Sequence, residues 1–185
     1  MDEVVLDELP APIEIKSPDS QVSLREFTSG DAQELFDLIN RNRDFLSRHD
    51  VPVNYRGSED VQRSIDSKRK YGAISFCIRD LNNTLIGTCY IQPSRTGPRI
   101  AEIGYYLGEE FTGKGNGSQA IRLLCGFGFE KFKLEEIRVS ARKDNISSQR
   151  ALESCGFKMS ELSPLFQKPS EKYIYYSLTP PSLIK

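Results

Sequence analysis

The feature that most constrains this chain is a glycine-spaced loop between an expected strand and an expected helix. Residues 101–118 read AEIGYYLGEEFTGKGNGS, and glycine recurs at positions 113, 115 and 117. The preceding residues are mostly apolar, and from Ala120 to Phe127 apolar residues recur at helical spacing. Uncovered backbone N–H groups would therefore lie at the positive end of a helix dipole, which favours phosphate. The candidate pyrophosphate-binding loop consists of Gly113, Lys114, Gly115, Asn116, Gly117 and Ser118.

Composition and charge limit the classes of partner that we expect this chain to bind. The chain has 185 residues, a net charge of -1 and a sequence pI of about 6.0. It therefore lacks the basic field of a nucleic-acid-binding protein. No apolar run is long enough for a membrane span, and the acidic N-terminus, MDEVVLDELP, is unlike a signal peptide. We expect a cytoplasmic protein, a monomer or a homodimer, with neither nucleic acid nor membrane as a partner.

The cysteines predict neither a metal site nor a disulfide framework. Cys77, Cys89, Cys125 and Cys155 lie far apart, and no C-x-x-C pair occurs. Most of them fall in apolar patterns of expected strands or helices, where a reduced and buried thiol is the usual state. None stands beside a base that could activate it, so a covalent enzyme intermediate is not expected.

The order of apolar patterns predicts one mixed α/β (α+β) domain. We place an N-terminal arm at 1–20, with an edge strand at 13–16, the domain at 21–180 and a tail at 181–185. The expected order is strand, two helices, three strands, helix, strand, helix and final strands. The expected strands are 22–27, 73–79, 85–92, 99–107, 136–141 and 172–178, and the expected helices follow Thr28, Ser58, the glycine loop and Asn145. Hairpin and crossover connections together predict a mixed sheet.

The glycine spacing alone leaves three interpretations open. A dinucleotide fingerprint would need a third glycine after the G-x-G pair, which the sequence does not supply at the required spacing. A nucleoside-triphosphate loop needs a lysine after its last glycine, whereas Lys114 comes earlier. A glycine turn with a purely structural role remains the third interpretation.

A second strand-to-helix corner favours a ligand site. The stretch DNISSQRALESCGF, residues 144–157, also follows an expected strand, so both corners would face the same edge of the sheet. Together with GYYLGEEFTGKGNGSQAIRLL, residues 104–124, it resembles the GCN5-related N-acetyltransferases, the GNAT family. Within that family it resembles the ribosomal-protein N-terminal (Ser/Ala) acetyltransferases. The resemblance covers about residues 22–178.

The resemblance implies a mostly antiparallel, V-shaped sheet flanked by helices, with acetyl-coenzyme A in its opening and no metal. The backbone of Tyr105, Tyr106 and Leu107 would hold the pantetheine, the glycine loop the pyrophosphate, and Asn145 the pantetheine or phosphate end. The chain departs from the family where Thr112 replaces the arginine or glutamine that usually opens the phosphate loop.

Two residues are candidates for proton transfer. Glu102 is a carboxylate in an otherwise apolar strand, at a position where the family often has an acid, and would act as the base. Its alternative interpretation is a solvent-facing glutamate or a salt-bridge partner. Many relatives have a tyrosine acid where this chain has Leu152, so Ser148, one turn earlier, is the candidate acid. Its alternative role is to support the Asn145 helix cap.

The sequence says less about the part of the site that would bind the acceptor of the acetyl group. We expect His49 to be solvated, although its loop would border the acceptor site by resemblance, and we expect the charges of helix 58–70 to form a solvated face. The expected activity is direct acetyl transfer to an amine, and a protein N-terminal α-amine is the first class considered. The alternatives are a small-molecule amine (polyamine, amino acid or antibiotic), a non-catalytic acyl-coenzyme A sensor and a nucleotide-binding module.

Overall fold

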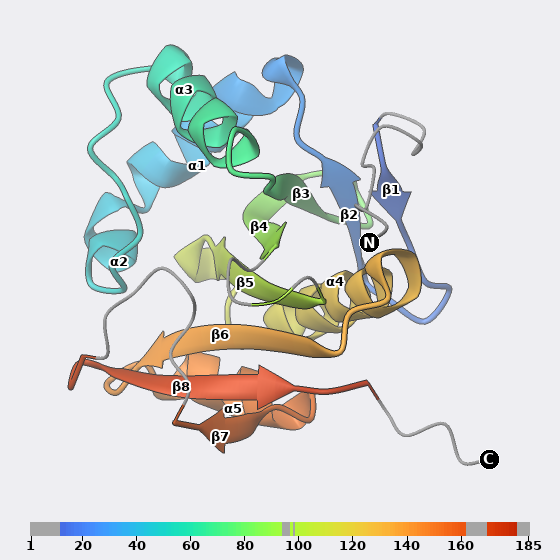
Figure 1. Ribbon diagram of the computed structural model, residues 1–185. Helices are drawn as coiled ribbons and strands as arrows, with labels where there is room; N and C mark the ends of the chain where they lie inside the picture. Colours follow the sequence, from blue (N-terminus) through green and yellow to red (C-terminus); the bar gives the residue numbers. More distant parts are fainter. Residues whose placement is uncertain (1–11, 94–96, 98, 162–169, 181–185) are drawn as a thin grey trace.

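One eight-stranded sheet organises the computed structural model, which describes residues 12–93, 97, 99–161 and 170–180. The strand order is β1-β2-β3-β4-β5-β6-β8-β7 (Figure 1). Neighbouring strands are antiparallel except β5 and β6, which are parallel. The strands are β1 Glu14–Ile15, β2 Val22–Glu26, β3 Ile74–Asp80, β4 Leu85–Pro93, β5 Ile100–Leu107, β6 Glu136–Arg142, β7 Lys158–Ser160 and β8 Tyr173–Leu178. This confirms the expected mixed and mostly antiparallel sheet.

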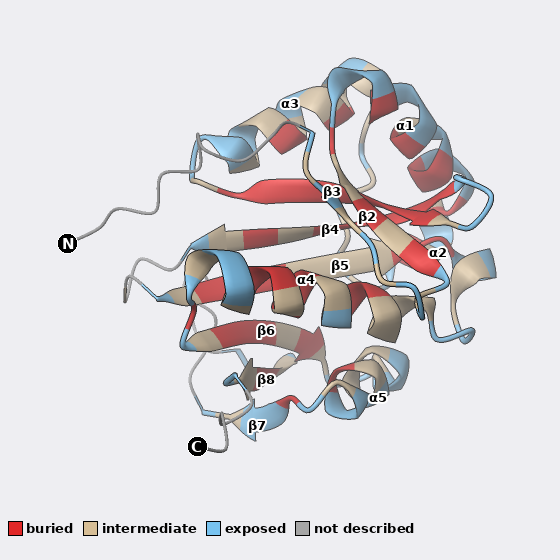
Figure 2. Ribbon diagram, turned by 90° about the vertical axis from the view of Figure 1, so that its right-hand side faces the viewer, coloured by how far each residue is buried: buried red, intermediate tan, exposed pale blue. Residues whose placement is uncertain are grey.

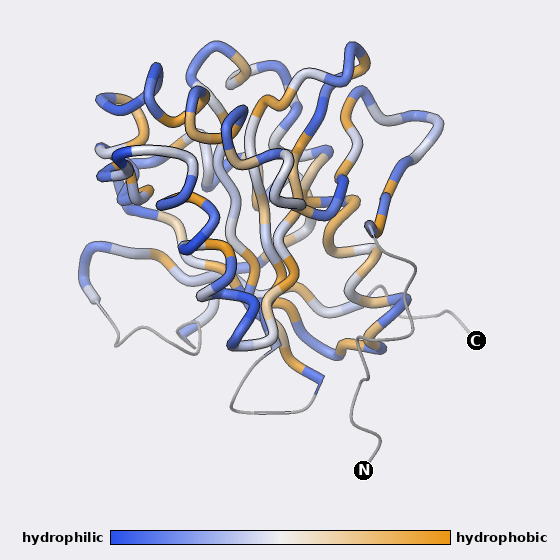
Figure 3. Tube along the Cα trace, turned by 90° about the horizontal axis from the view of Figure 1, so that it is seen from above, coloured by the Kyte–Doolittle hydropathy of each residue, from blue (hydrophilic) through white to orange (hydrophobic). Residues whose placement is uncertain are grey.

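Helices cover both faces of the sheet. They are α1 Ala32–Arg41, α2 Arg43–Ser47, α3 Ser58–Arg69, α4 Asn116–Phe132 and α5 Ile146–Ser154. The strand β3 is buried on both sides, because Phe76 packs in the core under α4 whereas Cys77 packs with α1 and α3 (Figure 2). Seen from above, hydrophobic segments gather toward the centre of the trace and hydrophilic ones toward its outer loops (Figure 3). Of the helices in the described part, none is long and apolar enough to cross a membrane.

The parallel strands β5 and β6 diverge along their length. Their register contains only the pairs Ile100–Glu136, Ala101–Ile137 and Glu102–Arg138. Beyond these pairs β5 continues to Leu107 and β6 to Arg142 without pairing to one another. The edge of each strand that faces the other is therefore free of sheet hydrogen bonds toward its C-terminal end. This divergence is the V-shaped opening implied by the resemblance.

An ion cluster around the buried pair Asp31 and Arg79 fixes the start of α1 against β3. Arg79 Nη2 lies 2.8 Å from both Asp31 Oδ1 and Glu34 Oε2, and Arg25 also bonds Asp31. Asp31 accepts hydrogen bonds from the N–H of Thr28 at 2.9 Å and from its hydroxyl at 2.8 Å. Burial alone would raise the pKa of Asp31, but the bonds from Thr28 and Arg79 outweigh it, so the pKa is lowered.

The structure corrects two helix starts. Thr28 caps a short 3-10 helix, Ser29–Asp31, and Asp31 is the N-cap of α1. Ser58 is the first residue of α3, and Gly57 is its N-cap. The expected edge strand is confirmed as β1, which pairs with β2 and joins the described end of the N-terminal arm to the sheet. The rest of the arm, residues 1–11, and the tail, 181–185, lie outside the described residues.

Candidate active site

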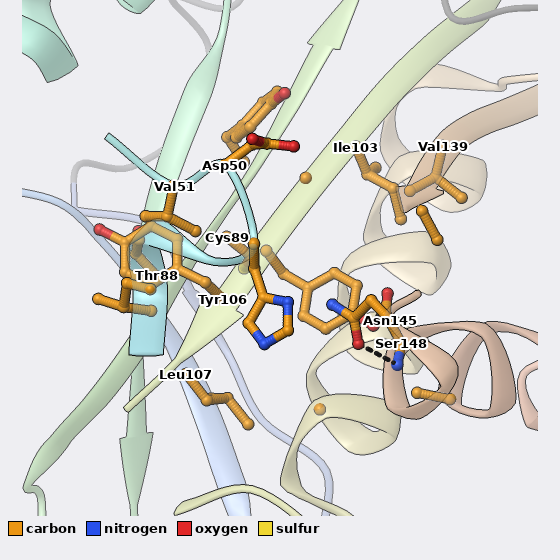
Figure 4. Close-up of a pocket in the computed structure, with 18 of the residues that line it drawn as sticks. Asp50, Val51, Thr88, Cys89, Ile103, Tyr106, Leu107, Val139, Asn145 and Ser148 are labelled. Carbon is orange, nitrogen blue, oxygen red and sulfur yellow. Dashed lines mark hydrogen bonds between the residues drawn. The ribbon is translucent and has the colours of Figure 1, made fainter. Parts of the chain in front are cut away.

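The V-shaped opening contains a cavity of about 910 Å³. Its walls come from both arms of the sheet, and Ile103, Leu107 and Val139 are among the side chains that line it (Figure 4). The glycine loop and α5 close one side, and α3 with the segment that follows α2 closes the other. Both expected strand-to-helix corners therefore meet at one cavity.

The glycine loop has the backbone that an anion cradle needs. Gly113 and Gly115 have φ angles of +71° and +80°, and Gly115 is the N-cap of α4. These left-handed conformations are costly for residues with a side chain. No heavy atom lies within 4 Å of the position that a Cβ of Gly113 would take. The first N–H groups of α4 have no partner within the helix, so open N–H donors border the cavity.

The residues at the start of the loop support it from within. The hydroxyl of Thr112 donates to the carbonyl of Glu109 at 2.7 Å. The side-chain amide of Asn116 donates to the carbonyl of Phe111 at 3.1 Å. Thr112 therefore holds the turn before the loop, and the missing arginine or glutamine is not replaced by an equivalent side-chain donor at this position.

Asn145 caps α5 through the backbone N–H of Ser148, so the hydroxyl group of Ser148 remains available. Asn145 Oδ1 accepts the backbone N–H of Ser148 at 3.0 Å, the dashed line in Figure 4. The Ser148 hydroxyl lies 3.0 Å from the hydroxyl of Tyr105. The cap and the proposed acid role therefore use different atoms of Ser148. Burial raises the pKa of Tyr105 to about 12, so this hydroxyl stays protonated at neutral pH.

Glu102 is buried at the point where β5 and β6 begin to diverge. Its exposed fraction is 8%, so the solvent-facing interpretation is wrong. The hydroxyl of Tyr90 donates to Oε1 at 3.2 Å, and Oε2 is buried without a hydrogen-bond partner among the described residues. Burial raises the pKa of Glu102, against the opposing effects of Tyr90 and of Lys68. Glu102 therefore brings a buried carboxylate with a raised pKa to the wall of the cavity.

Lys68 was expected on a solvated face, and that expectation is wrong. Lys68 is half-buried, lines the cavity, and places Nζ 4.1 Å from the ring centroid of Tyr90. Its side chain lies on the buried face of α3, three residues after Ile65 and seven after Val61. That spacing was the signal in the sequence that could have identified it.

His49 was also expected to be solvated, and it lines the cavity instead. Its ring packs edge-on against Phe45, with centroids 4.9 Å apart. Its Nδ1 atom is buried and has no hydrogen-bond partner among the described residues. Phe45 and His49 are four residues apart, so one side of this segment faces inward.

Asp50 joins the two sides of the opening. It has a positive φ of 60° and accepts bonds from Arg142 Nη1 at 2.9 Å, Lys172 Nζ at 2.7 Å and the Tyr173 hydroxyl at 2.8 Å. Burial alone would raise the pKa of Asp50, but the bonds from Lys172, Arg142 and Tyr173 outweigh it and lower the pKa to about 2. We call these four residues the Asp50 cluster. It connects the segment after α2 to β6 and β8.

The four cysteines are free thiols, and burial raises the pKa of Cys77 to about 12. Among the described residues, no group of three or more histidine, cysteine, aspartate and glutamate side chains is placed to hold a metal ion. Besides hydroxyl groups and backbone donors, the cavity is lined by a thiol whose pKa is raised by burial and by the ionisable side chains that follow: Cys89 is the thiol, and the others are His49, Asp50, Lys68, Glu102, Arg142, Asp144 and Arg150.

Comparisons with known proteins agree with this geometry. Residues 21–158 match the family model described as "Acetyltransferase (GNAT) domain". The "Probable N-acetyltransferase YjcK" of Bacillus subtilis (strain 168) is 29% identical over 146 residues, which cover 74% of this chain and 80% of that protein.

Solved structures share the fold, as two examples show. Mycobacterium smegmatis RimJ in complex with CoA-disulfide superposes with a TM-score of 0.77 at 18% identity, over 95% of this chain and 91% of that one. The ribosomal-protein-S5-alanine acetyltransferase of Vibrio fischeri superposes with a TM-score of 0.73 at 22% identity, over 90% of this chain and 96% of that one. With the family model matching most of its length, the chain belongs to the GNAT family of acetyltransferases.

Proposed function

We propose that this enzyme transfers an acetyl group from acetyl-coenzyme A directly to an α-amino group, that of a protein N-terminus. The observation that carries the proposal is one continuous arrangement along β5. Glu102, whose Oε2 has no hydrogen-bond partner in the part of the chain that the structure describes, lies at one end of the open strand edge, and the glycine loop follows the other end. The complex of RimJ with CoA-disulfide and the substrate in the name of the S5-alanine acetyltransferase support it.

The described residues fit coenzyme A. The unpaired edge of β5 from Ile103 to Leu107 offers backbone donors and acceptors to the amide groups of the pantetheine arm. The open N–H groups of residues 113–118 suit the pyrophosphate at the start of α4. The Asn145 side chain, which caps α5, lies at the same cavity. When bound there, acetyl-coenzyme A supplies the acetyl group as a thioester.

The roles of the protein side chains follow from their positions. Oε2 of Glu102 accepts a proton from the acceptor ammonium, directly or through one water, which frees the nitrogen lone pair. The nitrogen would then bond to the acyl carbon and release its second proton to water, while the Ser148 hydroxyl would give a proton to the sulfur as the carbon–sulfur bond breaks, so that coenzyme A leaves as the free thiol. Tyr105, whose hydroxyl lies 3.0 Å from that of Ser148, would return a proton to Ser148 and take one up from water in turn. No covalent bond to the enzyme is needed.

The charges around the acceptor side favour a single ammonium group over a polyamine. Lys68 is a cation within the cavity wall, and Asp50 is already paired with Arg142 and Lys172. Glu102 is therefore the cavity carboxylate without a salt bridge that could meet an incoming cation. A polyamine would bring further positive charges close to Lys68, and that repulsion disfavours its binding.

A thiol-release assay tests the proposal. The panel should contain peptides with free α-amines, the same peptides acetylated at the N-terminus, spermidine, free amino acids and an aminoglycoside. We expect release with the free peptides and none above background with the blocked ones, whose acetylated position mass spectrometry will locate. Turnover confined to spermidine or another small amine would contradict the proposed acceptor. Acetyl-coenzyme A binding without turnover of any amine would contradict the proposed catalysis.

A further inference from the structure

The side chains of three residues from neighbouring elements meet at one place in the cavity wall, and Glu102 is one of them. Lys68 comes from the last turn of α3, Tyr90 from β4 and Glu102 from β5. The ammonium of Lys68 lies 4.1 Å from the ring centroid of Tyr90, and the hydroxyl of that ring lies 3.2 Å from Glu102 Oε1. Tyr90 thus contacts both the cation and the carboxylate.

Gly104 makes room for this arrangement. Tyr90 and Gly104 are register partners in β4 and β5, and Gly104 stands two residues after Glu102. A Cβ at Gly104 would lie 2.4 Å from Cε1 and 2.9 Å from the hydroxyl oxygen of Tyr90. The ring therefore lies over the space that a side chain at position 104 would fill, and its hydroxyl reaches along the same face of β5 to Glu102.

We propose that Lys68 and Tyr90 are positioning residues for Glu102: Tyr90 fixes Oε1 and leaves Oε2 to the acceptor, and Lys68 keeps the carboxylate ionised. This rests on the proposed role of Glu102 as the base. A protonated Glu102 could not accept a proton, and its burial in the opening favours the protonated form. A cation held nearby by the face of an aromatic ring opposes that tendency, although burial also lowers the pKa of Lys68 itself.

The other charged and titratable groups near Glu102 do not replace Lys68. Arg138 of β6 is the register partner of Glu102, but its Nη2 atom lies 2.8 Å from Glu136 Oε2. Burial raises the pKa of Tyr90, so its hydroxyl remains a donor. Lys68 is therefore the cation whose charge is left to act on Glu102.

The first test measures kcat/KM against pH with the best acceptor found. In Lys68→Met the acidic limb of the profile should move to higher pH by about one unit, because the carboxylate loses a nearby cation. Lys68→Arg should restore the wild-type profile. Tyr90→Phe should move the limb in the same direction, since it removes the donor to Oε1. Lys70→Met is the control, because Lys70 is exposed at the end of the same helix and should leave the profile unchanged.

The second test measures the titration of Glu102 directly and needs no activity assay. Carbon-13 NMR of protein labelled at the glutamate carboxyl carbons, with Glu102→Gln to assign the signal, should show Glu102 titrating at higher pH in Lys68→Met than in wild type. An unchanged titration in folded Lys68→Met would overturn the inference. Retention of the acidic limb in Glu102→Gln would instead contradict the proposed base, and the NMR titration would still decide the role of Lys68.

Discussion

The hydroxyl oxygens of Tyr105 and Ser148 lie 3.0 Å apart, although the residues are 43 positions apart in sequence. Tyr105 is on the open strand β5, and Ser148 is in the first turn of α5. The contact joins the two strand-to-helix corners on the side of the cavity where the glycine loop lies. Position 152 is a fully buried leucine in this chain and supplies no hydroxyl group. Tyr105 and Ser148 supply two hydroxyl groups to the cavity instead.

Replacing Ser148 by alanine should lower kcat by ~10-fold or more, with a smaller change in KM for the cofactor, as expected for loss of a proton donor. The backbone N–H that bonds Asn145 is retained, so the cap and the melting temperature should be preserved. Steady-state kinetics with varied acetyl-coenzyme A will measure both constants, and Ser67→Ala, on the exposed side of α3, is the control. A kcat within twofold of wild type would limit Ser148 to helix capping.

Tyr105→Phe distinguishes the role of the Tyr105 hydroxyl from that of the Ser148 hydroxyl. If Tyr105 returns the proton to Ser148, its loss should lower kcat while Ser148 still contacts the substrate, so the defect should be smaller than that of Ser148→Ala. The double variant should then be no slower than Ser148→Ala, because the two groups act in series. Multiplicative losses in the double variant would show that the hydroxyl groups act independently.

Gly115→Val should weaken acetyl-coenzyme A binding. Position 115 needs a φ of +80°, which valine adopts at a high cost, so the loop would move its N–H groups away from the phosphates. Loss of one hydrogen bond to a charged phosphate corresponds to about tenfold in affinity, measurable by calorimetry. Gly126→Ala, inside α4 with no atom within 4 Å of its added Cβ, is the control. Unchanged affinity in a folded Gly115→Val protein would remove the loop from the binding site.

Glu102→Gln keeps the shape of the side chain and removes its charge. If Glu102 is the base, kcat should fall and the acidic limb of the pH profile should flatten. If Glu102 only attracts the cationic amine, KM for the amine should rise and kcat at high pH should recover. Wild-type values of kcat, KM and the pH profile would leave deprotonation to water or to the free-amine fraction of the acceptor.

Asp31→Asn should destabilise the fold at neutral pH by about 3 kcal/mol, because it removes the buried carboxylate that bonds Arg25, Thr28 and Arg79 and leaves Arg79 paired with Glu34 alone. The pKa of Asp31 is lowered in the folded state, so its contribution is complete above the unfolded pKa of about 3.9 and is lost as the pH falls toward the folded pKa. Urea unfolding of wild type and variant should therefore differ at pH 7 and converge in acid. Asp37→Asn, exposed on α1, should show no such difference.

Local patterns were sufficient to predict most elements and the two corners. The apolar runs of β3 and β4, the helical spacing after Gly117 and the Asn145 cap each depend on neighbouring residues, and each expected element is present in the structure. The GNAT resemblance also depended on contiguous strings. Each of those features depends on residues that lie within about one helix or strand length of one another in the sequence.

The acceptor side could not be predicted in the same way, because its contacts join distant residues. The spacing of Lys68 indicates the inner face of α3, but its contact with Tyr90 depends on how α3 packs against β4, and the bond from Tyr90 to Glu102 depends on the register in which β4 pairs with β5. The space that Gly104 leaves for the Tyr90 ring depends on the same register. Asp50 binds Tyr173 across 123 positions, a distance over which no periodic pattern operates.

The Asp50 cluster connects parts of the molecule that the backbone leaves separate. β5 and β6 are paired only at Ile100–Glu136, Ala101–Ile137 and Glu102–Arg138, so no ladder hydrogen bond sets their spacing at the wide end. There, Asp50 with Arg142 and Lys172 supplies ionic contacts between the two arms at partly exposed positions. Dissolved salt screens such contacts much more than it affects a buried backbone ladder. The width of the opening is therefore a dimension of this fold on which ionic strength acts directly.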